Sequence, residues 1–115
     1  MDGCVFCKIA TKEIPATIRR EEDDCIAFDD AHPKAPTHVL IVPKAHIASA
    51  RELGVNDATL IGRMVLMAAA IAKEAGIAER GYKLAVNCGE DGGQVVPHLH
   101  LHLIGGKPLG GGCVA

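Results

Sequence analysis

The sequence predicts an α+β domain in which a five-stranded antiparallel sheet carries one principal helix, with a short helix near the N-terminus. Three observations favour this class. Five short segments are rich in branched apolar residues, and several alternate polar with apolar side chains, which is the pattern of a half-buried strand. A single longer segment, 57–75, has apolar side chains at helical spacing. The expected strands do not alternate with helices, so a parallel α/β sheet is not predicted.

Length and composition indicate one globular domain, 1–115, with a single core. An apolar content of 49% and a net charge of −2 argue against disorder and against a nucleic-acid binder that works by bulk positive charge. The longest apolar run, 64–72, is too short to span a membrane, and no signal peptide is expected because the first residues lack a basic segment. Five cysteines, an odd number, are expected to be reduced thiols or metal ligands in a cytoplasmic protein.

The first half of the chain is expected to supply a short helical turn and three strands. The turn covers 4–9 and places Cys4 and Cys7 on one side, because they are three residues apart. Segments 16–20 and 25–28 are the strands of a hairpin around the acidic turn 21–24. A proline-punctuated loop, 29–36, then leads into a strand at 38–43.

The second half is expected to supply the principal helix and two strands. The helix should begin with Asn56 as N-cap and end before Gly76 in the C′ position. The strand 82–87 and a glycine-rich loop, 89–93, lead to the last strand, 98–104. The segment 107–115 is rich in glycine and is predicted to be a flexible tail.

The last strand alternates histidine with leucine, and this is the most informative feature of the sequence. In a strand, His98, His100 and His102 share one face at a spacing of roughly 6.6–6.8 Å, so a single phosphorus atom can contact only one of them closely. The central residue, His100, is the candidate for that contact. The alternatives are a solvated strand face and a weak surface metal site. The glycine pairs 92–93 and 105–106 favour a ligand site, because glycine lets backbone approach a ligand closely.

The run GGQVVPHLHLHLIGG resembles the signature of the histidine-triad (HIT) nucleotide hydrolases and transferases. The resemblance continues through FCKIATKEIPA, IAFDDAHPKAPTHVLIVPKAHI and LAVNCGEDGGQVV, and the pair Gly105–Gly106 is similar to the Hint-like branch of purine nucleoside phosphoramidate hydrolases. It implies cleavage of a P–N or P–O bond at the α-phosphate of a purine nucleotide, through a nucleotidyl-histidine and with no metal needed for the chemical step. It also implies a homodimer whose two sheets join. The alternatives are a dinucleoside polyphosphate hydrolase, a nucleotidyltransferase and a nucleotide-binding regulatory protein.

The resemblance further implies roles for individual residues. His100 matches the nucleophile, and the other catalytic matches are His98, His102 and His38. The matches to substrate-binding residues are Phe6, Ile9, Phe28 and Leu40 around the base, Asp30 on the ribose, and Asn87, Gly93, Gln94 and Val95 on the phosphate. Judged without the triad, the apolar members of this set are core residues, Asp30 caps a loop and Asn87 closes a turn. Val95 stands where relatives commonly have serine or threonine, so the contact made by that hydroxyl is left open.

A zinc site is also implied by the resemblance. Zinc-bearing relatives place their ligands at positions that match Cys4, Cys7, His46 and His98. Four protein ligands of this kind form a closed tetrahedral site, which makes the zinc structural. The alternative is a pair of buried thiols beside a free His98. The chain lacks the tryptophan-proline ending of many Hint proteins, which leaves the leaving-group preference open. The sequence predicts neither the base preference nor the physiological substrate.

Overall fold

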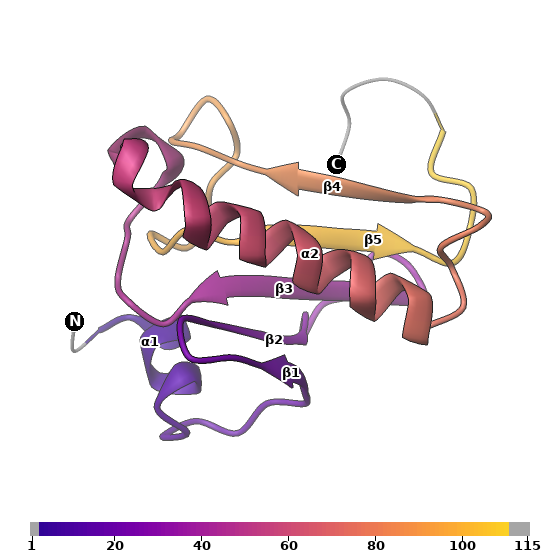
Figure 1. Ribbon diagram of the computed structural model, residues 1–115, viewed down its shortest axis with the longest axis horizontal. Helices are drawn as coiled ribbons and strands as arrows, with labels where there is room; N and C mark the ends of the chain where they lie inside the picture. Colours follow the sequence, from indigo (N-terminus) through magenta and orange to yellow (C-terminus); the bar gives the residue numbers. More distant parts are fainter. Residues whose placement is uncertain (1–2, 111–115) are drawn as a thin grey trace.

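The computed structural model describes residues 3–110, and Figure 1 shows them as a single sheet with a long helix across one face. The elements in chain order are α1 (Val5–Ala10), β1 (Ile18–Glu21), β2 (Cys25–Asp29), β3 (Thr37–Pro43), the short 3-10 helices η1 (Ala50–Glu52) and η2 (Val55–Asp57), α2 (Ala58–Glu74), β4 (Tyr82–Val86) and β5 (Leu101–Gly105). The predicted α+β class, the five-stranded antiparallel sheet and the principal helix are confirmed. The predicted flexible tail lies partly outside the described residues, which end at Gly110.

All strand pairs are antiparallel, in the order β1-β2-β3-β5-β4, so β1 and β4 form the two edges. Alternation along each strand assigns its side chains to two faces. Val39 and Ile41 of β3 lie on the face covered by α2, whereas His38 and Leu40 lie on the other face. β2 and β3 are buried along nearly their whole length because they are the inner strands and both of their faces are covered.

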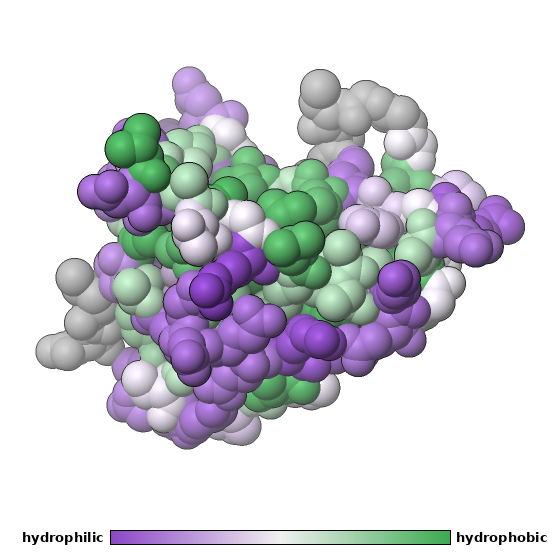
Figure 2. Space-filling view, in the orientation of Figure 1, coloured by the Kyte–Doolittle hydropathy of each residue, from purple (hydrophilic) through white to green (hydrophobic). Residues whose placement is uncertain are grey.

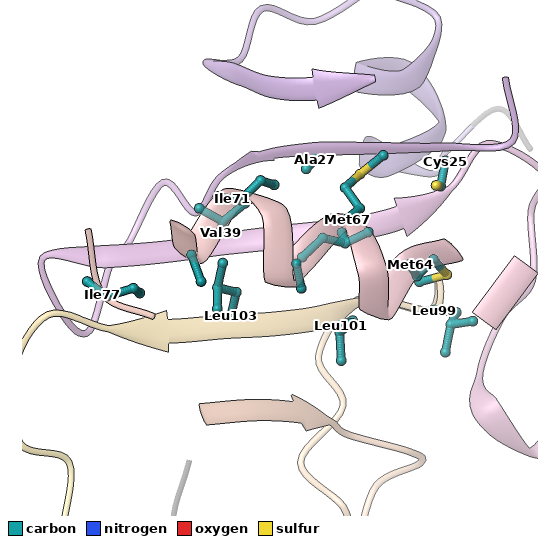
Figure 3. Close-up of a cluster of buried hydrophobic side chains, with 13 residues drawn as sticks. Cys25, Ala27, Val39, Met64, Met67, Ile71, Ile77, Leu99, Leu101 and Leu103 are labelled. Carbon is teal, nitrogen blue, oxygen red and sulfur yellow. The ribbon is translucent and has the colours of Figure 1, made fainter. Parts of the chain in front are cut away.

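The face under α2 holds the larger core, drawn in Figure 3. Met64, Met67 and Ile71 of α2 pack there against leucines of the histidine segment, Leu101 and Leu103. Burying each such side chain stabilises the fold by roughly 1.5–3 kcal/mol. The segment Val55–Glu74 is long and apolar enough, by length and composition alone, to cross a membrane. Packing of its inner face on the sheet accounts for part of that apolar character, since Met64, Met67 and Ile71 are buried there, whereas Leu66 on the outer face is exposed.

The ends of α2 differ in how well they match the prediction. Gly76 has a φ of 76° and lies at C′, as predicted, and the N–H groups of Gly76 and Ile77 close the last turn on Lys73 and Ala72. The predicted N-cap, Asn56, is wrong. It lies inside η2, and the carboxylate of Asp57 instead accepts the N–H of Gly54 at 2.9 Å. A 3-10 turn precedes the helix, which begins at Ala58, one residue later than an N-cap at Asn56 requires.

The opposite face carries α1 and the histidines. Phe6 and Ile9 of α1 pack on Phe28, Leu40 and Val42 in a second, smaller core. The prediction of a strand over 98–104 is wrong for its first half, because β5 begins at Leu101. A bend at residues 96–98 turns the chain before the ladder starts, so only His102 of the three histidines belongs to the strand. The alternation of faces still holds, since Leu99, Leu101 and Leu103 are all buried under α2.

Candidate active site and metal centre

A cavity of about 1110 Å³ opens on the sheet face opposite α2. Its volume slightly exceeds the roughly 300–1,000 Å³ typical of small-molecule sites. The walls come from α1, the loop before β1, the ends of β2 and β3, the loop after β4, and β5. Apolar side chains form one part of the wall, and the histidines together with the glycine-rich loop after β4 form another part. The predicted residues in the lining are Phe6, Ile9, Phe28, Asp30, His38, Leu40, Asn87, Gly93, Val95, His100 and His102.

A hydrogen bond fixes which ring nitrogen of His100 carries the proton. It is 7% exposed, and its Nδ1 lies 2.7 Å from the backbone carbonyl oxygen of His98. A carbonyl oxygen only accepts, so Nδ1 carries the proton and, in the neutral ring, Nε2 holds the free lone pair. A neutral imidazole with a free Nε2 lone pair on a cavity wall is a nucleophile in its reactive tautomer.

His38 and His102 form a chain of hydrogen bonds that starts at the backbone. The N–H of Lys34 donates to Nδ1 of His38 at 3.0 Å, so the proton of the neutral His38 ring is on Nε2. Nε2 of His38 then donates to Nδ1 of His102 at 3.0 Å. His102 must in turn carry its own proton on Nε2, which leaves that N–H to donate to a ligand in the cavity.

Both rings of this chain are neutral at pH 7. Burial, reinforced by the neighbouring His100 and His38, lowers the pKa of His102 to about 4. Burial also lowers the pKa of His38, although the carboxylate of Asp30 opposes this. The two rings therefore supply a hydrogen-bond donor to the cavity without a formal charge.

Asp30 lies beside this chain. Its Oδ2 is 3.3 Å from Nε2 of His38, and its Oδ1 accepts the backbone N–H of His32 at 2.8 Å. Ligand atoms of Asp30, His38 and His102 all lie within 4.8 Å of one another, a spacing that also suits a metal ion. The hydrogen-bond chain argues against an ion there, because Nε2 of His38 carries a proton and offers no lone pair.

The loop between β4 and β5 folds on itself and presents backbone to the cavity. The side chain of Asn87 donates to the Gly92 carbonyl at 2.7 Å, and Gly93 has a φ of 77°. A Cβ on Gly92 would lie 2.3 Å from the Cys88 carbonyl oxygen, so only glycine fits this turn. The N–H of Val95 makes no hydrogen bond within residues 3–110 and can donate to an anion, while its side chain is 89% exposed.

Gln94 lies in this loop but does not line the cavity. Its amide donates to the Ala48 carbonyl at 2.7 Å and to the Val96 carbonyl at 3.0 Å, and it accepts the N–H of Gly89 at 2.9 Å. With three backbone partners it holds the loop against the segment after β3. Its predicted contact with phosphate is therefore not supported by its position, and its role is to shape the loop.

The apolar part of the cavity is built around two phenylalanines. Their rings meet edge to face at a centroid separation of 5.4 Å, and Phe6 also meets His100 at 5.2 Å. Ile9 and Leu40 are almost fully buried beside them. This slot can enclose a flat ring next to the candidate nucleophile.

Sequence reasoning missed several wall residues. They include His32 and Lys34 of the loop before β3, residues 14–17 before β1, and Asp91. His32 and Lys34 share their loop with Asp30, and that proximity was the available signal. No pattern in 14–17 distinguishes a cavity wall from an ordinary connection.

A second cluster lies beside the cavity and unites Cys4, Cys7, His46 and His98. Their ligand atoms all lie within 4.8 Å of one another. The Cys4 sulfur is 3.2 Å from Nδ1 of His98, and the Cys7 sulfur is 3.3 Å and 3.5 Å from Nδ1 of His46 and His98. In a tetrahedral zinc site, Zn–S of about 2.3 Å and Zn–N of about 2.0–2.1 Å give S–N edges of roughly 3.5 Å. The predicted four residues thus fit a zinc ion closely.

The ring of His98 is already oriented with a free nitrogen toward this cluster. Its Nε2 donates to the Pro43 carbonyl at 2.9 Å, so Nδ1 is free to accept or to ligate. The side chain is fully buried and does not line the cavity. His98 therefore faces the sulfur atoms instead of flanking the reacting centre.

Comparisons with known proteins agree with this geometry. Residues 11–109 match the HIT domain family, a range that contains every cavity-lining residue outside α1. The purine nucleoside phosphoramidase of Escherichia coli (strain K12) is 45% identical over 106 residues, which cover 92% of this chain and 89% of that protein. A HIT family hydrolase from Clostridium thermocellum has a TM-score of 0.95 at 45% identity, with 99% of both chains covered. A zinc-bound histidine triad family protein from Mycobacterium smegmatis has a TM-score of 0.78 at 28% identity, covering 90% of this chain and 74% of that one.

Proposed function

The chain belongs to the HIT domain family and is a nucleotide hydrolase of that type, and on that premise we propose that it cleaves the P–N bond of purine nucleoside phosphoramidates. The observation that carries the proposal is the fixed tautomer of His100, whose Nδ1–H bond to the His98 carbonyl frees Nε2 on the cavity wall. The 45% identical purine nucleoside phosphoramidase supports the choice of substrate class.

The reaction proceeds in two displacements. Nε2 of His100 attacks the α-phosphorus, and the P–N bond breaks with its electron pair going to nitrogen, which takes up a proton from solvent and leaves as the amine; the water that attacks in the second step returns a proton to solvent. Water then attacks the nucleotidyl-histidine, and the bond from phosphorus to Nε2 breaks. The products are the amine and a nucleoside monophosphate, and His100 returns to its starting tautomer.

Charge that develops on the phosphoryl oxygens is stabilised by donors already in place. The Nε2–H of His102, oriented by His38, and the N–H of Val95 are the two donors for this task. A well-placed donor of this kind contributes about 3 kcal/mol to transition-state stabilisation. Val95 has no hydroxyl to add a further contact, so the leaving group meets an apolar side chain at this position.

The rest of the nucleotide is bound by the opposite part of the cavity. The slot between Phe6, Phe28 and Leu40 encloses the base, and Ile9 closes its end. Asp30 accepts hydrogen bonds from the ribose hydroxyls through Oδ2, since Oδ1 already accepts the His32 N–H. This arrangement spans the distance from base to α-phosphate within one cavity.

We further propose that Cys4, Cys7, His46 and His98 hold a structural zinc ion. The S–N distances and the preset Nδ1 of His98 support the ligand set, and a histidine triad family protein bound to zinc is known among the structural neighbours. With four protein ligands the metal would supply folding energy and no open coordination position. Thiolate ligands need reduced cysteines, so we propose a cytoplasmic location, where thiols remain reduced.

A symmetric homodimer is proposed from the surface of α2 and β4. β4 is an edge strand with its ladder unpaired on one side, and Leu84 and Val86 are 36% and 46% exposed on it. Leu66 of α2 is 70% exposed, and Figure 2 shows apolar surface over the middle of α2 and toward β4. Pairing two β4 edges around a two-fold axis would join the sheets and cover these side chains.

A substrate panel tests the function. Adenosine and guanosine phosphoramidates and a dinucleoside polyphosphate are each incubated with the protein, with and without acceptor alcohols and amines, and products are separated by chromatography. Release of nucleoside monophosphate and free amine from the phosphoramidates at the highest kcat/KM is expected. Transfer of the nucleotide to an acceptor would identify a nucleotidyltransferase instead. Turnover near the uncatalysed rate would identify a nucleotide-binding protein and refute the proposal.

A further inference from the structure

One residue, His98, joins the metal cluster to the nucleophile. Its backbone carbonyl accepts the Nδ1–H of His100 at 2.7 Å, and this contact fixes the tautomer of His100. Its side chain is held from both ring nitrogens, by the Pro43 carbonyl at 2.9 Å and by the Cys4 sulfur at 3.2 Å. The orientation of the acceptor that His100 needs therefore depends on what holds the His98 ring.

A second contact links the same two sites through α1. Phe6 lies between Cys4 and Cys7 in sequence, and its ring meets His98 at a centroid distance of 5.9 Å and His100 at 5.2 Å. α1 has only six residues, too few for a helix to be stable on its own, which takes about 12–15. Cys4 and Cys7 bring α1 to His98 and His46, so the cluster also holds the Phe6 ring against His100.

We propose that the cluster of Cys4, Cys7, His46 and His98, when it binds a divalent thiophilic ion, is a positioning device for His100. Through the His98 carbonyl and the Phe6 ring, it keeps His100 in the tautomer whose Nε2 is free. Without the ion, the Nδ1 side of the His98 ring and the two cysteines of α1 are joined only by weak thiol contacts, and the His98 carbonyl can shift. His100 then samples both tautomers and several ring orientations. A misplacement of about 1 Å at a reacting group costs roughly a hundredfold in rate, so kcat should fall about ten- to a hundredfold.

The test compares four forms of the full chain: zinc-loaded wild type, wild type stripped by a chelator, His46→Ala and Met67→Ala. His46 is a member of the cluster, where it contacts Cys7 at 3.3 Å and the His98 ring at 5.0 Å, and none of its contacts found within residues 3–110 is with His100. Met67 lies on the inner face of α2 and is buried against the opposite face of the sheet, so Met67→Ala destabilises the fold without touching either site. It is the matched control for general loss of stability.

The first readout is independent of activity. The ¹⁵N chemical shifts of the His100 ring distinguish a fixed Nδ1–H tautomer from a mixture of the two. We expect a fixed tautomer in zinc-loaded wild type and in Met67→Ala, a mixture in the stripped protein and in His46→Ala, and recovery when zinc is returned to the stripped protein. The second readout, kcat per folded molecule, should follow the tautomer. KM is expected to rise as well, because Phe6 of the base slot lies between the ligands Cys4 and Cys7 and meets the His98 ring at 5.9 Å, so the comparison is made on kcat at saturating substrate.

A His100 tautomer that stays fixed in both zinc-deficient forms would overturn the proposal. So would an equal loss of kcat in Met67→Ala and His46→Ala, which would mean that the cluster only adds stability. If His46→Ala does not fold, the stripped wild type is measured in sucrose instead. Sucrose is excluded from the protein surface and therefore favours the folded state, so the stripped protein can still be compared with the zinc-loaded one. The kinetic readout rests on the proposed function, but the tautomer does not. If the zinc-loaded protein does not cleave phosphoramidates, the proposed function is wrong. If the His100 tautomer does not depend on zinc, the positioning role is wrong, and the two results are distinguishable.

Discussion

Acidification from pH 7 to pH 5 is expected to destabilise the fold through His102. Burial, with His100 and His38 as lesser causes, lowers the pKa of His102 from its ordinary value of 6.5 to about 4. Between these two values the unfolded chain binds a proton that the folded chain does not. The free energy of unfolding therefore falls as the pH falls from about 7 toward 4, and the loss is complete once both states are protonated.

The size of the effect follows from the two pKa values. Complete titration across the difference corresponds to about 3 kcal/mol, and the part lost between pH 7 and pH 5 is about 2 kcal/mol. His102 keeps some contact with solvent, which reduces this to about 1–2 kcal/mol. His38 lies beside it, also has a lowered pKa because of burial, and acts in the same direction.

Urea unfolding of wild type and His102→Gln at pH 7, 6 and 5 measures the contribution. Glutamine keeps the polar volume and does not titrate, and the other ionisable groups cancel when the two proteins are compared at each pH. The stability gap between wild type and His102→Gln should shrink by about 1–2 kcal/mol from pH 7 to pH 5. A gap that stays constant within about 0.3 kcal/mol would refute the neutral, buried His102 on which the donor chain depends.

Three further outcomes are expected. Gly92→Ala should lower kcat/KM at least about tenfold with little change in Tm, because the added Cβ would lie 2.3 Å from the Cys88 carbonyl and displace the loop; unchanged kinetics would contradict the tight turn. Metal analysis of protein purified without chelators should find about one equivalent of zinc per chain, and less than about a tenth of an equivalent after zinc supplementation would exclude the site. Sedimentation at micromolar concentration should give about twice the chain mass of 12.0 kDa, while a monomer alone would rule out the dimer.

The sequence predicted the sheet and the principal helix because their signals are local. The continuous apolar run in β3 reflects burial on both faces of the sheet, and the helical spacing around Met64 and Ile71 reflects burial on one face of α2, as the structure confirms. The errors fall where tertiary contacts decide. Asp57, and not Asn56, closes the start of α2 through a 3-10 turn, and the start of β5 is delayed to Leu101 by the bend before it. Neither feature has a periodic pattern.

For the site, residue types could be predicted from the sequence but their partners could not. The positions of His100 and His102 on the cavity wall agree with the expectation, as does the gathering of two cysteines with His46 and His98. The tautomers depend on backbone geometry that no residue pattern displays, such as the turn that brings the Lys34 N–H to Nδ1 of His38. Gln94 was assigned to phosphate by resemblance, yet its amide is occupied by Ala48, Val96 and Gly89, a three-way contact that no linear pattern reveals.

The central claim is that Nε2 of His100 is the nucleophile, and trapping the covalent intermediate tests it most directly. Wild-type protein is mixed with a nucleoside phosphoramidate labelled in the nucleotide, quenched rapidly, digested and mapped by mass spectrometry under conditions that preserve phosphorus–nitrogen bonds. The label is expected on His100, and His100→Ala should lose the labelled peptide and nearly all turnover while it still binds nucleoside monophosphate. Label on another residue, or a His100→Ala protein that keeps more than about a tenth of wild-type turnover, would contradict the account, since loss of a nucleophile costs several orders of magnitude.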